Sequence, residues 1–275
     1  MRRILYIFTA ALVLAGCTAR EILVTRPVSL GLRIEKVSGS KVRFTVTPGR
    51  EEATYMFFTI TESESAFDKP EREAAKEYIG LMEDNYNYEG KEAAAAGEKK
   101  IGSFVDFACL RGSRTVNLLF LNQGTGYKLL LFQVHPKSHE ILGEVQCERF
   151  RTKDVEMKDL DFEISFSDDL LTIEPSDQDR TYVWGFERVS RIEDDYDHDP
   201  FNYLYYLIDM YEEYGFIEHR LYNGTGSYDM SRERIREGEP YVVTAIGYEN
   251  GEINSRIGLA TFILRGGDYF LIGQP

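Results

Sequence analysis

The sequence predicts a mainly β protein made of two tandem β-sandwiches, each with a helical insertion after its third strand. Two observations carry this prediction. Short runs of alternating apolar and polar residues recur along the chain with turn signals between them, as half-buried strands require. The same order of runs also occurs twice within the 275 residues, which indicates a duplicated domain.

The first three strands of the two halves correspond position by position. In each half an alternating run is followed by a second strand that ends in proline, and a Thr-Tyr pair then opens the third strand. Proline after a strand fits a strand, loop, strand connection. The matching positions are 30–34 with 160–164, Pro48 with Pro175, and 54–55 with 181–182.

Each half then contains a helical insertion and returns to strands. Pro70 introduces the first insertion, and Asp199 with Pro200 introduces the second, where Asp suits the N-cap and Pro the first helical position. Apolar runs at 127–134 and 241–247 predict the later strands. In the second half, a hairpin turn is predicted by the dipeptide Asn250-Gly251.

This arrangement resembles the tandem immunoglobulin-like or fibronectin type III-like modules common in Bacteroidota-type lipoproteins. The resemblance covers about residues 28–264 and rests on the proline after the second strand, the aromatic residues of the third and the terminal hairpin. It implies two tandem immunoglobulin-like β-sandwiches. It does not imply a ligand, because one fold serves many functions.

The N-terminus has the order of a bacterial secretion signal. Arg2 and Arg3 precede an apolar stretch at 4–14, which is shorter than the about 20 residues that a membrane-spanning helix needs. Residues 14–17, Leu-Ala-Gly-Cys, resemble a lipobox. This resemblance implies that Cys17 is lipidated and becomes the new N-terminus, so that acyl chains anchor the protein to a membrane.

These observations define the expected organisation and location. We expect a signal peptide at 1–16, a lipidated cysteine and short tether at 17–27, one sandwich at 28–153, and a second sandwich with a C-terminal tail at 154–275. By the sorting logic of lipoproteins, Thr18 is compatible with delivery to the outer membrane of the cell envelope. Whether the protein faces the periplasm or the cell surface is left open.

Charge and cysteine content exclude some functions. A formal net charge of −14 repels nucleic acid, so we expect no nucleic-acid partner. Beyond Cys17, only Cys109 and Cys147 are present, and they form either one disulfide or two buried free thiols, of which the thiols are favoured.

The second insertion, residues 193–219, is the candidate binding region. Most of its aromatic residues are expected to pack in the core, while exposed ones could stack on sugar rings or contact a protein. The candidate binding residues are Tyr196, Tyr205, Tyr211, Asp195, Asp197 and Asp199. The alternating carboxylates resemble the start of a calcium loop, but Pro200 and Tyr206 occupy the positions that need Gly and Glu, so we expect a solvated loop with a helix cap and no metal.

Other motifs favour structural roles. Trp184, the only tryptophan, alternates with Tyr182 and Phe186 and is expected in the core. Pro136 separates His135 from His139, which favours a hairpin turn over a metal motif. No nucleophile, phosphate-binding or metalloprotease motif is present, so we expect neither catalysis nor a cofactor.

The sequence therefore predicts a membrane-anchored lipoprotein with a non-catalytic binding, adhesion or envelope-scaffold role. Its partner would be an unknown protein or glycan. One alternative is an accessory glycan-binding lipoprotein, suggested by the aromatic residues of the second insertion. An alternative of a different class is a small hydrolase or protease inhibitor that uses the insertion loops.

Overall fold

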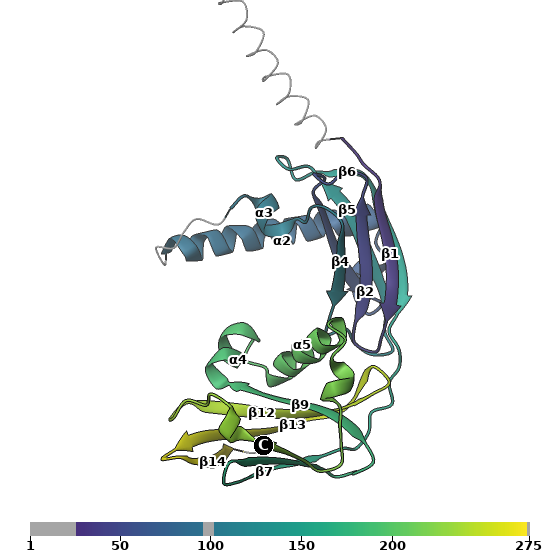
Figure 1. The fold of residues 1–275 in the computed structure, drawn as a ribbon. Helices are drawn as coiled ribbons and strands as arrows, with labels where there is room; N and C mark the ends of the chain where they lie inside the picture. The colour runs from purple at the N-terminus through teal and green to yellow at the C-terminus, as the bar shows by residue number, and fades with distance from the viewer. Residues whose placement is uncertain (1–25, 96–101, 274–275) are drawn as a thin grey trace, which may run out of the picture. The chain divides into compact units, whose positions relative to one another are not determined.

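The computed structural model describes residues 26–95 and 102–273, so the expected signal peptide, Cys17 and most of the tether lie outside the described residues. The chain divides into two compact units, unit 1 with Met1–Asp154 and unit 2 with Val155–Pro275 (Figure 1). Both units are β-sandwiches with a helical insertion after the third strand, which confirms the predicted fold class.

Unit 1 consists of two antiparallel three-stranded sheets, with strand orders β1-β2-β4 and β3-β5-β6. Phe44 and Tyr55 are fully buried in the core between them. The strands are β1 (Leu30–Val37), β2 (Val42–Pro48), β3 (Tyr55–Thr61), β4 (Arg114–Leu118), β5 (Gly126–Val134) and β6 (Ile141–Arg151).

The central strand β5 is buried on both faces, which explains its unbroken apolar run. Successive side chains of a strand point to opposite faces of the sheet. Leu129 and Leu131 pack in the sandwich core, whereas Phe132 and Val134 belong to a second apolar cluster that contains Ile79 of α2. The insertion that supplies this cover comprises η1 (Ser65–Asp68), α2 (Glu71–Ala95) and α3 (Phe104–Ala108).

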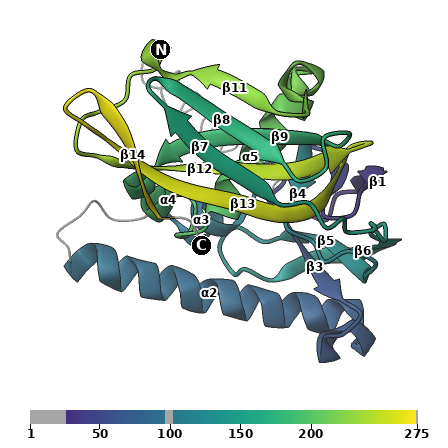
Figure 2. The ribbon, with the colours of Figure 1, turned by 90° about the horizontal axis from the view of Figure 1, so that it is seen from below.

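Unit 2 has a three-stranded sheet with order β11-β8-β7 and a five-stranded sheet with order β10-β9-β12-β13-β14. Tyr182, Leu171 and Phe262 are fully buried between them. Figure 2 shows β7 and β8 crossing over β12 and β13 of the other sheet. The strands are β7 (Phe162–Ser167), β8 (Leu170–Pro175), β9 (Thr181–Arg188), β10 (Tyr222–Asn223), β11 (Gly226–Asp229), β12 (Pro240–Glu249), β13 (Glu252–Arg265) and β14 (Asp268–Gly273).

The insertion of unit 2 lies on the outer face of its five-stranded sheet, opposite β7 (Figure 1). It contains α4 (Val189–Asp195), α5 (Pro200–Glu213) and η2 (Ile217–Arg220), and η3 (Met230–Arg232) follows β11. Gly185 of β9 permits the close approach of α5, because a Cβ there would lie 2.6 Å from Leu207 Cδ2. Asp199 caps α5 as predicted, accepting a hydrogen bond from the Phe201 amide at 2.8 Å.

Each unit contains a corresponding hydrogen bond from the buried tyrosine of its third strand. In unit 1 Tyr55 Oη donates to the Gly112 carbonyl at 2.8 Å, and in unit 2 Tyr182 Oη donates to the Gly224 carbonyl at 3.1 Å. Gly112 lies just before β4 and Gly224 just before β11, and both have a φ near 70°. This left-handed conformation favours glycine. The duplication therefore includes a long-range contact.

One of the later turns of unit 2 is the turn predicted from the sequence, and a second turn leads to an additional strand. Asn250 and Gly251 join β12 to β13 with φ of 55° and 81°, as a type I′ turn requires, which confirms the predicted turn. The expected C-terminal tail contains a further strand, β14, which the sequence pattern does not predict. This edge strand leaves Phe270, Leu271 and Ile272 exposed.

Candidate functional site

The expected acidic loop begins as a helix, so that part of the prediction is wrong. Residues 193–195 belong to α4. Arg191 pairs with Asp195 one turn further along α4, and with Glu187 near the end of β9, with both N···O distances at 2.9 Å. The pair of Arg191 with Asp195 has the i,i+4 spacing that stabilises a helix, so it supports the continuation of α4 to residue 195.

The three candidate carboxylates do not act together. Asp195 pairs with Arg191, Asp199 caps α5, and Asp197 is exposed with a φ of 53°. Among the described residues, no group of three or more His, Cys, Asp or Glu side chains could hold a metal ion. The acidic segment therefore brings together no set of cation ligands.

The aromatic residues of α5 divide between core and surface. Tyr205, a candidate binding residue, is only 4% exposed, so its expected place on a binding surface is wrong. Tyr206 and Met210, on a different face of the helix, are 48% and 41% exposed. A ligand at the surface would therefore meet Tyr206 before Tyr205.

Tyr196 lies at a shallow pocket beside α5. Its ring centroid is 5.5 Å from that of Tyr203 and 5.9 Å from that of Tyr206. The pocket has a volume of about 400 Å³. Its walls are Asp195, Tyr196, Tyr203, Tyr206, Leu207 and Met210. Two of the candidate residues, Asp195 and Tyr196, thus border one pocket.

A second cavity of unit 2, which we call the aromatic pocket, has a volume of about 230 Å³ and contains the third candidate tyrosine, Tyr211. It lies beside the edge of β9 that β10 leaves uncovered beyond Tyr182. Strand β12 pairs with β9 from Tyr182 to Arg188, whereas β10 pairs only with Thr181 and Tyr182. The walls are Trp184, Gly185, Phe186, Tyr203, Leu207, Tyr211, Arg220, Tyr222, Tyr228 and Glu233.

Three aromatic rings meet at angles in the aromatic pocket. The Trp184 ring centroid lies 5.8 Å from that of Tyr222, with the planes tilted by 54°, and 5.1 Å from that of Tyr228, with the planes at 71°. Trp184 is half-buried and packs against the core of unit 2. It therefore has the expected core contacts and also forms part of a pocket wall.

Two opposite charges complete the aromatic pocket. The guanidinium of Arg220 lies over the Tyr211 ring, 5.3 Å from its centroid. The Glu233 carboxylate accepts a hydrogen bond from Tyr228 Oη. This hydrogen bond is the main cause that raises the pKa of Tyr228, with burial second, and the tyrosine stays a donor at neutral pH. The pocket thus offers hydrogen-bond donors, a carboxylate acceptor and aromatic faces.

Unit 1 has different side chains at the corresponding place. Phe57 and Thr59 occupy the positions of Trp184 and Phe186 in the repeat. Phe57 packs against the core cluster of the sandwich, and so does Val116 of β4, the strand that corresponds to β11 in unit 2. Polar aromatic and charged side chains at this position are therefore a property of unit 2 and not of the fold.

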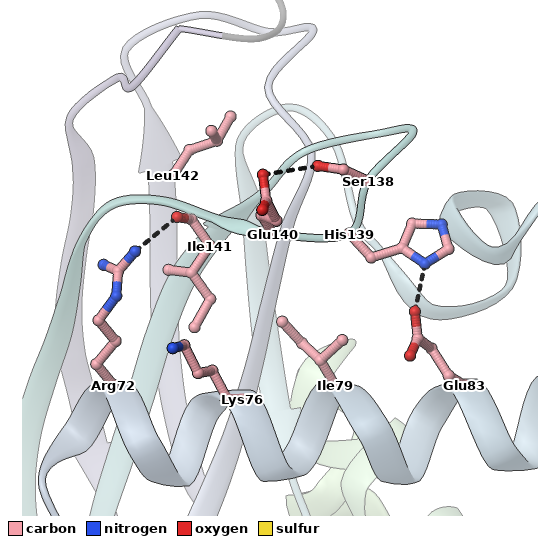
Figure 3. Close-up of a pocket in the computed structure, with 9 residues that line it drawn as sticks. All are labelled: Arg72, Lys76, Ile79, Glu83, Ser138, His139, Glu140, Ile141 and Leu142. Carbon is pink, nitrogen blue, oxygen red and sulfur yellow. Dashed lines mark hydrogen bonds and ion pairs between the residues drawn. The ribbon is translucent and has the colours of Figure 1, made fainter.

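Unit 1 has its own groove of about 460 Å³ between α2 and the β5–β6 hairpin (Figure 3). Arg72 crosses one end and donates to the Ile141 carbonyl at 2.9 Å. At the other end His139 Nδ1 lies 2.5 Å from Glu83 Oε1, while Ser138 Oγ donates to Glu140. The side chains at both ends thus hold the hairpin on the helix, and the serine hydroxyl is directed to a carboxylate and not to the imidazole.

Cys109 and Cys147 are both free thiols, so a disulfide is not formed. Cys109 packs against the cluster that contains Phe104 and Val134, and Cys147 against a different cluster that contains Ile60. Burial raises the pKa of the Cys109 thiol to about 12. The favoured alternative, two free thiols, is the one found, and both thiols are partly and not fully buried.

Sequence reasoning missed most of the aromatic pocket. The alternating pattern predicts Trp184 in the core, and it does not distinguish Arg220, Tyr228 and Glu233 from other surface residues, although all four border the pocket. One signal was available, because Tyr222 and Tyr228 flank the turn 224–226 close to an isolated arginine. Tyr222 lies in β10, which pairs with β9, and Tyr228 lies in β11, which pairs with β8 of the other sheet. Their contacts with Trp184 therefore depend on sheet order and sheet packing, which that signal does not contain.

Comparison with known proteins supports the N-terminal prediction. Residues 1–18 match the model of the prokaryotic membrane lipoprotein lipid attachment site. Among the described residues, none of the helices has the length and apolar character needed to cross a membrane. A comparison with curated proteins finds no match.

Similar solved structures contain fibronectin type III domains. A two-domain segment of chicken tenascin is 11% identical, with 86% of this chain and 100% of that chain covered and a TM-score of 0.25. The central fibronectin-III array of RIM-binding protein is 9% identical, with 90% and 64% covered and a TM-score of 0.22. The FN1–FN3 domains of chicken CNTN1 are 12% identical, with 84% and 64% covered and a TM-score of 0.26. At these scores, the fold assignment depends on the strand order and the insertions of the chain itself.

Proposed function

We propose that this protein is a lipid-anchored, non-catalytic binding protein of the outer membrane, with an adhesion or envelope-scaffold role, and that the aromatic pocket of unit 2 is its ligand site. The lipid attachment site at residues 1–18 supports the membrane anchor. Thr18, which follows the cysteine, supports delivery to the outer membrane.

The aromatic pocket is the observation that carries the proposal. Ligand sites are concave, rich in aromatic side chains and supplied with a few polar groups that set orientation. Trp184, Tyr222 and Tyr228 supply the rings, and Arg220 and Glu233 the charged groups. In unit 1, the strand that corresponds to β11 has the aliphatic Val116, which packs against the core. This difference between two copies of one fold favours a selected function over a general feature of packing.

The chemistry of the lining favours binding without catalysis. Among the described residues that border the aromatic pocket, Glu233 is the single carboxylate, and none is Ser, Cys or His. Hydrolysis generally needs a paired carboxylate or a nucleophile with a base. The pocket instead has the groups that hold a ligand in place.

Trp184 provides a direct test, because it is the only tryptophan and lies in the pocket wall. The soluble chain from residue 18 onward would be titrated with the polysaccharide and the protein fractions of a bacterial envelope, separately, while Trp184 emission is recorded. We expect at least one fraction to shift the emission saturably. Replacement Glu233→Gln should weaken that shift, whereas Tyr206→Ala, outside the pocket, should preserve it. No shift with either fraction would contradict the proposed site.

A further inference from the structure

We infer that the aromatic pocket binds an uncharged saccharide ring, an inference that rests on the proposed function of that pocket. A sugar ring has faces of C–H groups and an edge of hydroxyl groups. The Trp184 ring is tilted by 54° against Tyr222 and by 71° against Tyr228, so one of these rings can stack on the face of a sugar while the others contact its edge. Tyrosine and tryptophan combine apolar area with a polar group, which suits a ligand that has both.

The charged residues of the pocket match the hydroxyl edge of the ligand. Arg220 has only donors and Glu233 only acceptors when ionised, so together they can bind neighbouring hydroxyl groups. Glu233 already accepts from Tyr228 Oη, and this contact leaves further acceptor positions on a carboxylate. The two side chains therefore orient the ligand without requiring it to carry a charge.

Charge and size exclude several other ligands. Arg220 and Glu233 have opposite charges, so the local charge of the pocket is balanced. The chain as a whole carries −14, which disfavours polyanionic ligands. A cavity of about 230 Å³ lies below the usual range for drug-sized ligands, about 300–1,000 Å³, and suits one ring at a time. A neutral sugar at the end of a glycan has these properties.

The pocket is accessible at its charged edge. Arg220 is exposed, and its guanidinium rests on the face of Tyr211. The rest of a glycan could therefore extend into solvent beside Arg220 while its terminal ring is enclosed. Unit 1 has different side chains there, because Phe57 at the position of Trp184 packs edge-on against Phe44 of the core, and the aliphatic Val116 packs against the same cluster.

The test uses the soluble chain from residue 18 onward with methyl glycosides of glucose, galactose, mannose and N-acetylglucosamine, and with methyl glucuronide as the charged match of the glucoside. Binding would be measured by Trp184 emission and by calorimetry. We expect at least one neutral glycoside to bind saturably and the glucuronide to bind no better than the glucoside. Arg220→Gln and Glu233→Gln should each weaken binding by at least about tenfold, whereas Tyr206→Ala should not. Circular dichroism and melting curves would show that the variants remain folded.

The failure of this inference differs from the failure of the proposed function. If an envelope protein shifts Trp184 emission and no saccharide does, the pocket remains the ligand site and the saccharide assignment is wrong. If neither does, both are wrong. Preferential binding of the glucuronide, or neutral-sugar binding that persists unchanged in Arg220→Gln and Glu233→Gln, would also overturn the assignment.

Discussion

Neighbouring residues of the second insertion have unrelated roles, although their sequence pattern suggests a common one. Asp195 holds Arg191 within α4, and Asp199 begins α5. Tyr205 lies in the core, while the adjacent Tyr206 is exposed. A change of about 100° per residue along a helix is enough to separate these environments. Spacing alone therefore could not identify the binding residues.

The N-cap of α5 can be tested by replacing Asp199. Its carboxylate accepts from the Phe201 amide at 2.8 Å, and Asp199→Ala removes this acceptor. We expect the free energy of unfolding to fall by about 1 kcal/mol, measured by urea denaturation. Asn is an equally good cap, so Asp199→Asn should unfold close to the unmodified protein. Equal loss in both variants would contradict a capping role.

The thiol of Cys109 should be chemically unreactive in the folded protein. Burial is the main cause that raises its pKa to about 12, from a usual value of 9.0. At pH 8 this lowers the thiolate fraction by about a thousandfold. We expect slow reaction with a disulfide reagent in a Cys147→Ser background and fast reaction in urea. Rapid labelling of the folded chain would contradict the burial of this thiol.

At the scale of elements, close contacts between the two sheets of a sandwich determine which substitutions are tolerated. Gly258 of β13 faces Phe162 of β7 across the sandwich, and an added Cβ would lie 2.8 Å from Phe162 Cβ. We expect Gly258→Ala to reduce the free energy of unfolding by about 1–3 kcal/mol. The control is Gly273→Ala in β14, where the nearest atom, Thr261 Cβ, is 3.9 Å away. Similar melting temperatures for the two variants would contradict the packing shown.

Ionisation of Tyr182, in the third strand of unit 2, should lower the free energy of unfolding at alkaline pH. Burial is the main cause that raises the pKa of Tyr182 to about 12, whereas an unfolded tyrosine titrates near 10. Below pH 10 Tyr182 is protonated in both states. Between about pH 10 and 12 the unfolded state loses its proton first, so rising pH favours unfolding.

Urea denaturation at pH 8, 10 and 11 would measure this effect. We expect the free energy of unfolding to decline above pH 10 and the decline to be shallower in Tyr182→Phe. The phenylalanine variant also loses the hydrogen bond to the Gly224 carbonyl, so it should be less stable at pH 8. An identical pH slope in both proteins would show that Tyr182 is not protected by the core.

For the whole molecule, the lipid attachment site determines where the protein is found. The match covers residues 1–18 and includes Cys17. We expect the full chain to fractionate with membranes and to incorporate a labelled fatty acid, and Cys17→Ser to do neither. Two or more acyl chains provide stable anchoring, whereas a single chain gives only marginal, reversible binding. Membrane retention of an unlabelled Cys17→Ser protein would require another mode of attachment.

Much of the fold was predictable because its signals are local. Alternation along β1, the proline at the end of β8, the Asp199 cap and the turn at Asn250 each involve residues that are close in the chain. These patterns report backbone conformation directly. Residues 193–195 are helical although their composition is typical of a turn, and the pair of Arg191 with Asp195 supports that helix.

The amino-acid sequence by itself determined the lipid attachment site, the duplicated sandwich and the place of each insertion. Only the tertiary structure decided which side chains form the aromatic pocket. Trp184, Arg220 and Glu233 are far apart in the chain, and they meet because β10 covers only the start of β9 and α5 packs against Gly185. Such contacts depend on sheet order and on helix packing, which are non-local, whereas periodicity and turn signals describe only a few consecutive residues.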